Sequence, residues 1–149
     1  MKVLVTGGAG YIGSHTSYQL LKDDHEVTIL DNMEKGHESA LDIVKQAGEF
    51  DFLKSDLRDL VALRNMLNGK SFDAVIHFAA YLEVGLSVKQ PAIFFENNVV
   101  GSQNLFQVLL ENGINNVIFS SSAAVYGTQT SNSMISESSP KSPDSPYGE

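Results

Sequence analysis

The chain has 149 residues, a formal net charge of −8, 42% hydrophobic residues and no cysteine. This length fits one domain with a core of its own, and the composition is ordinary for a globular protein. The lack of cysteine excludes disulfides, thiolate metal sites and a cysteine nucleophile, and an acidic chain without a basic run disfavours nucleic acid as a partner.

Short β-branched runs alternate along the chain with longer amphipathic stretches. We expect strands at Lys2–Thr6, Glu26–Leu30, Phe50–Lys54, Ala74–Phe78 and Asn116–Ser120. We expect helices at Ile12–Lys22, Ser39–Ala47, Asp59–Leu67 and Ala92–Leu110. This alternation predicts an α/β fold with a doubly wound parallel sheet of the Rossmann type, and the nearly continuous apolar strands fit burial on both faces.

The sequence also gives information on membrane-spanning segments, a signal peptide and long loops. No apolar run approaches the roughly 18 residues that a membrane-spanning helix needs, and the N-terminal segment lacks the apolar region of a signal peptide. We therefore expect a cytoplasmic protein with no membrane partner. The tail from Gln129 to Glu149 is rich in Ser and Pro, which predicts a functional loop.

A glycine-rich turn follows the first expected strand and opens the first expected helix. Residues 6–13 read Thr-Gly-Gly-Ala-Gly-Tyr-Ile-Gly. Glycines let the backbone approach a pyrophosphate closely, and the helix N-terminus supplies N–H donors and a positive dipole end. The glycines at 8, 10 and 13 fit one dinucleotide fingerprint and those at 7, 10 and 13 fit another, so the glycines alone do not separate the two.

An acidic residue stands at the end of the second expected strand. Asp31 lies 18 residues after Gly13. A carboxylate at this place accepts hydrogen bonds from the adenosine ribose hydroxyls and repels a 2′-phosphate. The sequence therefore predicts that the cofactor is NAD rather than NADP.

Four further segments continue the pattern along the chain. They are Ser55–Asp59, His77–Ala80, Glu96–Gly101 and Phe119–Gly127. With the glycine turn, they resemble the extended short-chain dehydrogenase/reductase family, and within it the UDP-glucose 4-epimerases. The resemblance covers the whole chain but only the N-terminal part of such enzymes. It implies an incomplete NAD-binding Rossmann domain over residues 1–149, without the substrate domain.

The resemblance also implies a chemistry. A UDP-sugar is oxidised and reduced at C4 through bound NAD, which interconverts UDP-glucose and UDP-galactose. Tyr147 matches the family's base and opens a Tyr-x-x-x-Lys pair, and Ser122 matches the serine that hydrogen-bonds the same sugar hydroxyl. Because the chain stops before that lysine, we expect negligible turnover from the 149-residue chain alone. Ala123 and Ala124 stand where related dehydratases carry Asp-Glu, which disfavours dehydration.

The residues that hold the cofactor follow from the same resemblance. They contact the pyrophosphate, the adenosine ribose, the adenine and the nicotinamide half in turn. The expected set is Gly7, Gly10, Tyr11, Ile12, Gly13, Asp31, Asn32, Met33, Glu34, Lys35, Gly36, Asp56, Leu57, Phe78, Ala79, Ala80, Tyr81, Leu82, Asn97, Ser122 and Tyr147. Leu82 stands where some relatives carry a lysine that reaches the cofactor. We expect either weaker retention of the cofactor or a contact through the Leu82 backbone alone.

Two alternatives remain open. One is another extended-family sugar-nucleotide epimerase or reductase, and the other is a non-catalytic NAD-binding module. The presence of both Ser122 and Tyr147 argues against the module. The histidines show no metal-ligand spacing, so no metal is expected, and His77 is expected to close its strand rather than to act as a base. The helix Ala92–Leu110 resembles the family's dimer-forming helix, which implies a homodimer for the full protein.

Overall fold

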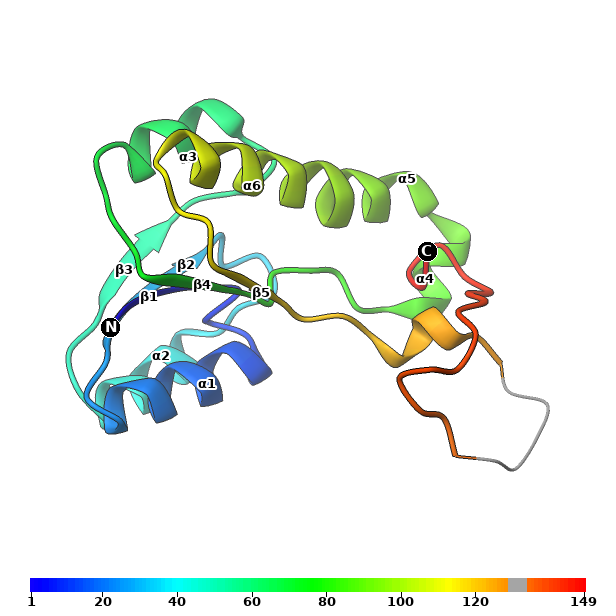
Figure 1. Cartoon of the computed structure of the whole chain (residues 1–149), viewed down its shortest axis with the longest axis horizontal. Coiled ribbons are helices and arrows are strands. Elements are labelled where there is room, and N and C mark those ends of the chain that lie inside the picture. Colours follow the sequence, from blue (N-terminus) through cyan, green and yellow to red (C-terminus); the bar gives the residue numbers. More distant parts are fainter. Residues whose placement is uncertain (129–133) are drawn as a thin grey trace.

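The computed structural model describes residues 1–128 and 134–149, and it places a five-stranded sheet between two layers of helices (Figure 1). The strands are β1 (Lys2–Thr6), β2 (Glu26–Asp31), β3 (Asp51–Lys54), β4 (Ala74–His77) and β5 (Val117–Phe119). Their order is β3-β2-β1-β4-β5, and all neighbouring pairs are parallel. The expected doubly wound Rossmann sheet is confirmed.

Helices cover both faces of this sheet. They are α1 (Tyr11–Lys22), α2 (Glu38–Lys45), α3 (Leu60–Leu67), α4 (Val84–Lys89), α5 (Pro91–Phe94) and α6 (Gly101–Glu111), with a π-helix η1 (Phe95–Val100) and a 3₁₀ turn η2 (Ala123–Tyr126). α1 and α2 lie on one face, and α3 and α6 lie on the other (Figure 1). Within the described ranges, no helix is long and apolar enough to cross a membrane.

The strand β1 contributes side chains to two separate cores. Leu4 belongs to the cluster that packs against α3 and α6, whereas Val3 and Val5 belong to the cluster that packs against α1 and α2. Burial on both faces explains why the strand is a continuous apolar run. On the first of these faces, α3 begins where the Asp59 carboxylate accepts the N–H of Ala62 at 2.9 Å, which caps the helix.

The long helix expected over Ala92–Leu110 is interrupted. It consists of α5, the π-helix η1 and α6, so a wider turn separates two α-helical segments. In the π-helix, the Asn98 side chain leaves the helix and binds the backbone of Tyr81. At the junction, a Cβ on Gly101 would lie 3.3 Å from Leu57 Cβ, so the glycine lets this helix approach the loop after β3. A shift of one backbone position leaves the apolar periodicity almost unchanged, which is why the pattern predicted one helix.

The helix α4 and the turn η2 were not expected from the sequence. The six residues of α4 and the four of η2 are too short to display a helical face. Of the predicted tail loop, residues 134–149 form turns without helix or strand, and residues 129–133 lie outside the described part.

The tail folds back along η2. The N–H of Ser142 donates to the Val125 carbonyl at 3.0 Å, and the N–H of Thr128 donates to Asp144 Oδ2 at 2.9 Å. The C-terminal segment then runs beside α4 (Figure 1), where the Tyr147 N–H donates to a helix side chain. The tail therefore reaches the carboxyl edge of the sheet.

His77 is buried at the end of β4 with both ring nitrogens engaged. The Ser102 hydroxyl donates to the Asn98 carbonyl at 2.6 Å, so it accepts the Nε2–H of His77 at 2.8 Å. Nδ1 is then the acceptor for the Thr6 hydroxyl at 2.6 Å. This describes a neutral imidazole with a fixed tautomer, and burial lowers the pKa of His77 to about 4. His77 thus closes its strand, as expected, and does not line the cavity described below.

The buried His77 should make the protein sensitive to acid. Between pH about 6.5 and about 4, the unfolded chain binds a proton at this position and the folded chain does not, so stability falls as the pH falls. The loss should reach about 2 kcal/mol between pH about 7.5 and about 5. His77→Gln keeps one donor and one acceptor and should remove this part of the pH dependence. Urea unfolding at both pH values measures it.

The exposed His15 on α1 offers a matched control for this experiment. His15→Gln should leave the difference in unfolding free energy between the two pH values as it is in the wild type. An unchanged difference in His77→Gln would contradict the assignment of His77 as a buried neutral base.

Candidate functional site

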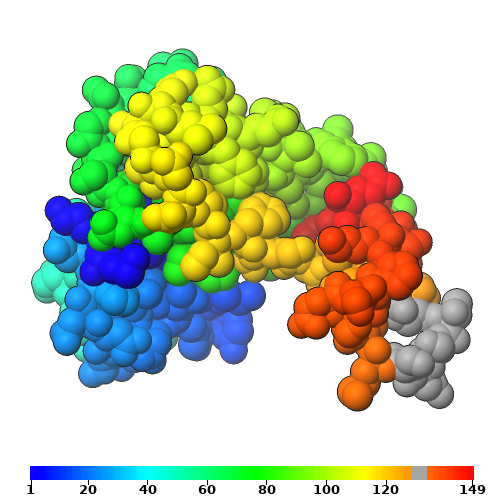
Figure 2. Space-filling model, in the orientation of Figure 1, coloured from blue at the N-terminus to red at the C-terminus, as the bar shows by residue number. Residues whose placement is uncertain are grey.

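One cavity of about 460 Å³ opens where the strands end. It runs along the carboxyl ends of β1, β2, β3 and β4, the edge at which doubly wound sheets bind ligands. Figure 2 shows the molecule hollowed between the N-terminal part in blue and the tail in orange and red. The volume is within the range of small-molecule sites.

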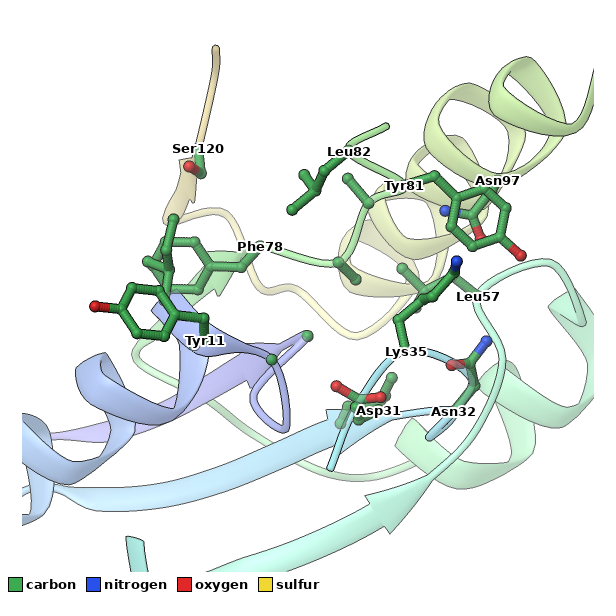
Figure 3. Close-up of a pocket in the computed structure, with 18 of the residues that line it drawn as sticks. Tyr11, Asp31, Asn32, Lys35, Leu57, Phe78, Tyr81, Leu82, Asn97 and Ser120 are labelled. Carbon is green, nitrogen blue, oxygen red and sulfur yellow. The ribbon is translucent and has the colours of Figure 1, made fainter. Parts of the chain in front are cut away.

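Most of the expected cofactor residues line this cavity. All of them do so except Met33, Glu34 and Ser122, and the lining also includes Leu30, His37, Ser55, Ser120 and Ser121. Figure 3 shows two ends, one with Tyr11, Phe78 and Ser120 and the other with Asn32, Leu57 and Tyr81. The cavity is therefore elongated and has a different set of side chains at each end.

The glycine turn is packed too tightly for any side chain at two of its positions. Gly7 has φ +72°, and a Cβ there would lie 2.6 Å from Ala79 N. A Cβ on Gly13 would lie 2.2 Å from Gly7 O. The lack of a side chain at these positions lets the turn lie close to α1 and to the loop after β4. The first turn of α1 contains no acidic residue. The positive end of the α1 dipole and its first N–H groups therefore face the cavity with no acidic side chain in the helix's own first turn, which suits a phosphate.

Asp31 is buried at the end of β2 and orders the loop around it. Its Oδ2 accepts the N–H of Ala9 at 3.0 Å, and its Oδ1 accepts the N–H of Met33 at 2.8 Å. An ionised carboxylate has about four acceptor positions, so both oxygens can still accept hydroxyl donors from a ligand. This geometry fits the ribose contact that the sequence predicted for Asp31.

Two of the residues that do not line the cavity have other places. Met33 has φ +64° and packs its side chain against the core cluster beneath α1 and α2. Glu34 lines a second, more open cavity of about 300 Å³ next to the first. Both residues lie outside the lining of the main cavity, and their contact with the adenosine ribose stays a prediction.

A network of charged and polar groups closes the end of the cavity near β3. Arg58 donates from Nε to Asp56 Oδ1 at 2.9 Å and from one terminal nitrogen to Asp56 Oδ2 at 2.6 Å. The same nitrogen donates to Glu34 at 2.8 Å, and Tyr81 donates its hydroxyl to Glu34 at 2.6 Å. Arg58 holds the pKa of the Asp56 carboxyl well below its ordinary value, so this carboxylate is charged at neutral pH. Sequence reasoning had not singled out Arg58.

Tyr147 lies in the cavity wall and is anchored by the short helix α4. Its N–H donates to Ser87 Oγ at 3.2 Å, and the Ser87 hydroxyl donates to the Val84 carbonyl at 2.7 Å. Ser87 is fully buried, so this anchor is protected from water. Tyr147 lies half-buried in the cavity wall together with Ser120 and Ser121.

Ser122 does not line the cavity, and its contact with the sugar hydroxyl stays a prediction. Its Oγ accepts the N–H of Ala124 at 3.1 Å and caps the turn η2. The serines of the same run that line the cavity are Ser120 and Ser121. The direction in which a strand releases its last side chains depends on its twist, and a run of three serines does not indicate which of them faces the site.

One buried hydroxyl in the wall points to a ligand. Ser55 is 8% exposed and lines the cavity, and its Oγ has no hydrogen-bond partner within the described part of the chain. A buried hydroxyl without a partner is costly, so a polar ligand group at this place would be stabilising. With the phosphate turn and Asp31, Ser55 makes the cavity fit a dinucleotide.

Comparison with known proteins agrees with this geometry. A family model described as GDP-mannose 4,6 dehydratase matches residues 4–149. A UDP-glucose 4-epimerase from Halalkalibacterium halodurans is 47% identical and matches 100% of this chain and 42% of the relative. A UDP-glucose 4-epimerase from Klebsiella pneumoniae is 46% identical over 87% of this chain and 94% of the relative.

A solved structure is similar over nearly the whole chain. The UDP-glucose 4-epimerase from Bifidobacterium longum in complex with NAD⁺ and UDP superposes with a TM-score of 0.92 at 36% identity, over 99% of this chain and 45% of that chain. The present chain therefore spans less than half the length of this protein and of the Halalkalibacterium relative.

Proposed function

Since this chain belongs to the UDP-glucose 4-epimerase family, we propose that its cavity binds NAD and that the whole protein interconverts UDP-glucose and UDP-galactose. One observation carries the proposal. A single cavity is lined both by the glycine turn with Asp31 and by Tyr147, which is more than a hundred residues away in the sequence. A site that only bound a phosphate group would not require a tyrosine in its wall.

The cofactor would lie along the cavity in one direction. The glycine turn and the start of α1 would hold the pyrophosphate through backbone N–H groups, and Asp31 would accept both hydroxyls of the adenosine ribose. The same carboxylate disfavours a 2′-phosphate, so the proposal specifies NAD and not NADP. The nicotinamide half would then lie near Phe78 and Tyr147.

The proton chemistry falls to the tyrosine. When bound, NAD supplies a hydride acceptor and donor for C4 of the sugar. Tyr147 would take the proton of the C4 hydroxyl as the hydride leaves and return it when the hydride comes back, so no net oxidation results. Ser122, Ser120 and Ser121 stand on the segment beside it, and one of these hydroxyls would orient the sugar hydroxyl.

Dehydration is the same-family alternative, because the matching family model carries a dehydratase description. Removal of water across C5 and C6 needs an acid and a base beside the catalytic serine. This chain has Ala123 and Ala124 there, in the first turn of η2, and neither can transfer a proton. This difference favours epimerisation.

A homodimer is part of the proposal for the whole protein. The long helical stretch exposes Phe95, Val99, Val100 and Leu110, whose exposed fractions range from 40% to 66%. An exposed apolar helix face supports a protein partner. The proposal identifies that partner as a second copy of the whole protein.

The direct test is product analysis by NMR. The whole protein is incubated with UDP-galactose, and the 149-residue chain is incubated in parallel. Appearance of UDP-glucose is the expected result for the whole protein, and the parallel incubation shows how much conversion residues 1–149 support. An unchanged sugar nucleotide would oppose this substrate, and a 4-keto-6-deoxy product would identify a dehydratase instead.

A further inference from the structure

The wall of the cavity near β3 contains a set of contacts that exceeds what a dinucleotide site requires. We propose that Tyr81 is a positioning residue for the cofactor, and that its hydroxyl closes a clasp which sets how long NAD stays bound. The clasp consists of Glu34, Asp56, Arg58 and Tyr81. The inference rests on the proposed binding of NAD in the main cavity.

The clasp joins three loops that are separate in the sequence. Glu34 follows β2, Arg58 follows β3 and Tyr81 follows β4. The Tyr81 hydroxyl donates to Glu34 Oε1 at 2.6 Å and accepts from Arg58 at 3.1 Å. Arg58 completes the ring of contacts with its 2.8 Å bond to Glu34 Oε2. Glu34, Arg58 and Tyr81 therefore each contact the other two, and loss of any one of these three breaks two contacts.

Tyr81 is the rigid member of the clasp. It is 8% exposed, and its ring packs edge-on against Phe94 with 5.7 Å between ring centroids. Its backbone is gripped by the Asn98 side chain, which accepts the Tyr81 N–H at 2.8 Å and donates to the Tyr81 carbonyl at 3.0 Å. Asn98 and Phe94 thus fix the backbone and the ring of Tyr81. The Tyr81 hydroxyl is thereby held in contact with Glu34 and Arg58, on the loops after β2 and β3.

A second contact joins two of the same loops. Lys35 Nζ lies 2.7 Å from Glu83 Oε1 and 5.8 Å from the centre of the Tyr81 ring, and Figure 3 shows Lys35 extending towards Tyr81. The Arg58 guanidinium lies 5.9 Å from the same ring. Two cations therefore flank the ring of Tyr81, which favours its position electrostatically.

The clasp borders both the main cavity and the smaller cavity beside it. Tyr81 and Lys35 line the main cavity, Glu34 lines the smaller cavity beside it, and Asp56 lines both. A ligand whose adenosine end lies against Asp56 leaves only after the loops after β2 and β4 separate. Separation breaks the bond from Tyr81 to Glu34, a hydrogen bond to a charged group, which is among the stronger kinds. The neighbouring Leu82 is 60% exposed, and its apolar side chain cannot form a hydrogen bond that would retain the cofactor.

The hydroxyl of Tyr81 can be removed without disturbing the packing of its ring. In the whole protein, Tyr81→Phe and Glu34→Ala should each release bound NADH about tenfold faster than the wild type, which corresponds to about 1.4 kcal/mol. The rate of association should stay within about twofold. The rates are followed by the fluorescence of NADH after dilution into excess unlabelled NAD.

The double variant tests whether the clasp acts as a unit. Tyr81→Phe combined with Glu34→Ala should release NADH about as fast as either single variant, because each change already removes the bond between Tyr81 and Glu34. Release about a hundredfold faster than the wild type would mean two independent contacts and would overturn the inference. The melting temperature of Tyr81→Phe separates a general loss of stability from a change in release.

A matched control removes a hydroxyl elsewhere. Tyr18 lies on α1 and does not line the cavity, so Tyr18→Phe should release NADH at the wild-type rate. If the wild type binds NADH and Tyr81→Phe releases it at the wild-type rate, the proposal that the clasp slows release is wrong. The proposal that the cavity binds NAD is then still supported. If the wild type does not bind NADH at all, the proposed function itself fails.

Discussion

Tyr147→Phe in the whole protein should lower kcat by about 10²- to 10⁴-fold while NAD stays bound. The change removes the only group of this residue that can carry a proton, and general acid–base catalysis contributes rate factors of that size. The ring remains to fill its place in the cavity wall, and the backbone N–H of Tyr147 keeps its bond to Ser87. Binding should therefore be nearly unaffected, and the loss should appear in kcat rather than in KM.

The measurement is the rate of UDP-galactose conversion by coupled assay, together with the NAD content of the purified protein. Tyr18→Phe serves again as the control, because it removes a phenol hydroxyl outside the cavity. A Tyr147→Phe variant with wild-type kcat would assign the proton transfer to another group. It would also remove the argument from Tyr147 against a non-catalytic NAD-binding module.

Gly13→Ala should abolish measurable NAD binding, with a Kd raised at least about a hundredfold, and should reduce the unfolding free energy by about 1–3 kcal/mol. The added Cβ would lie 2.2 Å from Gly7 O and 2.8 Å from the Gly8 Cα. Both atoms belong to the backbone of the phosphate turn, so no side chain can move aside. The turn itself must shift, and its N–H groups leave the positions that hold the pyrophosphate.

Gly85 provides the matched substitution. It lies within α4, and a Cβ there would meet nothing within 4 Å. Gly85→Ala should leave NAD binding unchanged and should stabilise the protein by roughly 0.5–1 kcal/mol, because glycine is unfavourable inside a helix. Urea unfolding and NADH titration of both variants give the comparison. Retention of wild-type affinity by a folded Gly13→Ala variant would mean that the turn does not carry the phosphate.

The regular part of the fold could be predicted from local patterns. The strand β1 has the expected bounds, and the other strands differ by one or two residues at their ends. The prediction failed where a structure leaves no periodic signal. The π-helix shifts the backbone by one position, and within it the Asn98 side chain makes a tertiary contact with the Tyr81 backbone that no local pattern indicates. The helix α4 is too short to show a periodic face.

The site was predicted in part for the same reason. Glycines at fixed spacing before a helix, and Asp31 at a strand end, are local features with local consequences, and the structure brings them into one cavity. Ser55 and His37 carry no such signal, because a serine or a histidine in a loop is compatible with many surroundings. Ser122 was chosen from its neighbours Ser120 and Ser121 by resemblance, and the tertiary structure places Ser120 and Ser121 in the cavity wall.

The sequence by itself determined the order of strands and helices, the phosphate turn and the acidic residue after β2, because each depends on residues close together in the chain. Only the tertiary structure decided which loops meet. The bond between Tyr81 and Glu34 spans 47 positions, and the bond between His77 and Thr6 spans 71. Such pairs exist because the parallel sheet places β2 and β4 on either side of β1, which brings the loops at their carboxyl ends together. No local pattern encodes that neighbourhood, so the contacts that hold the cavity together follow from the packing of the whole sheet.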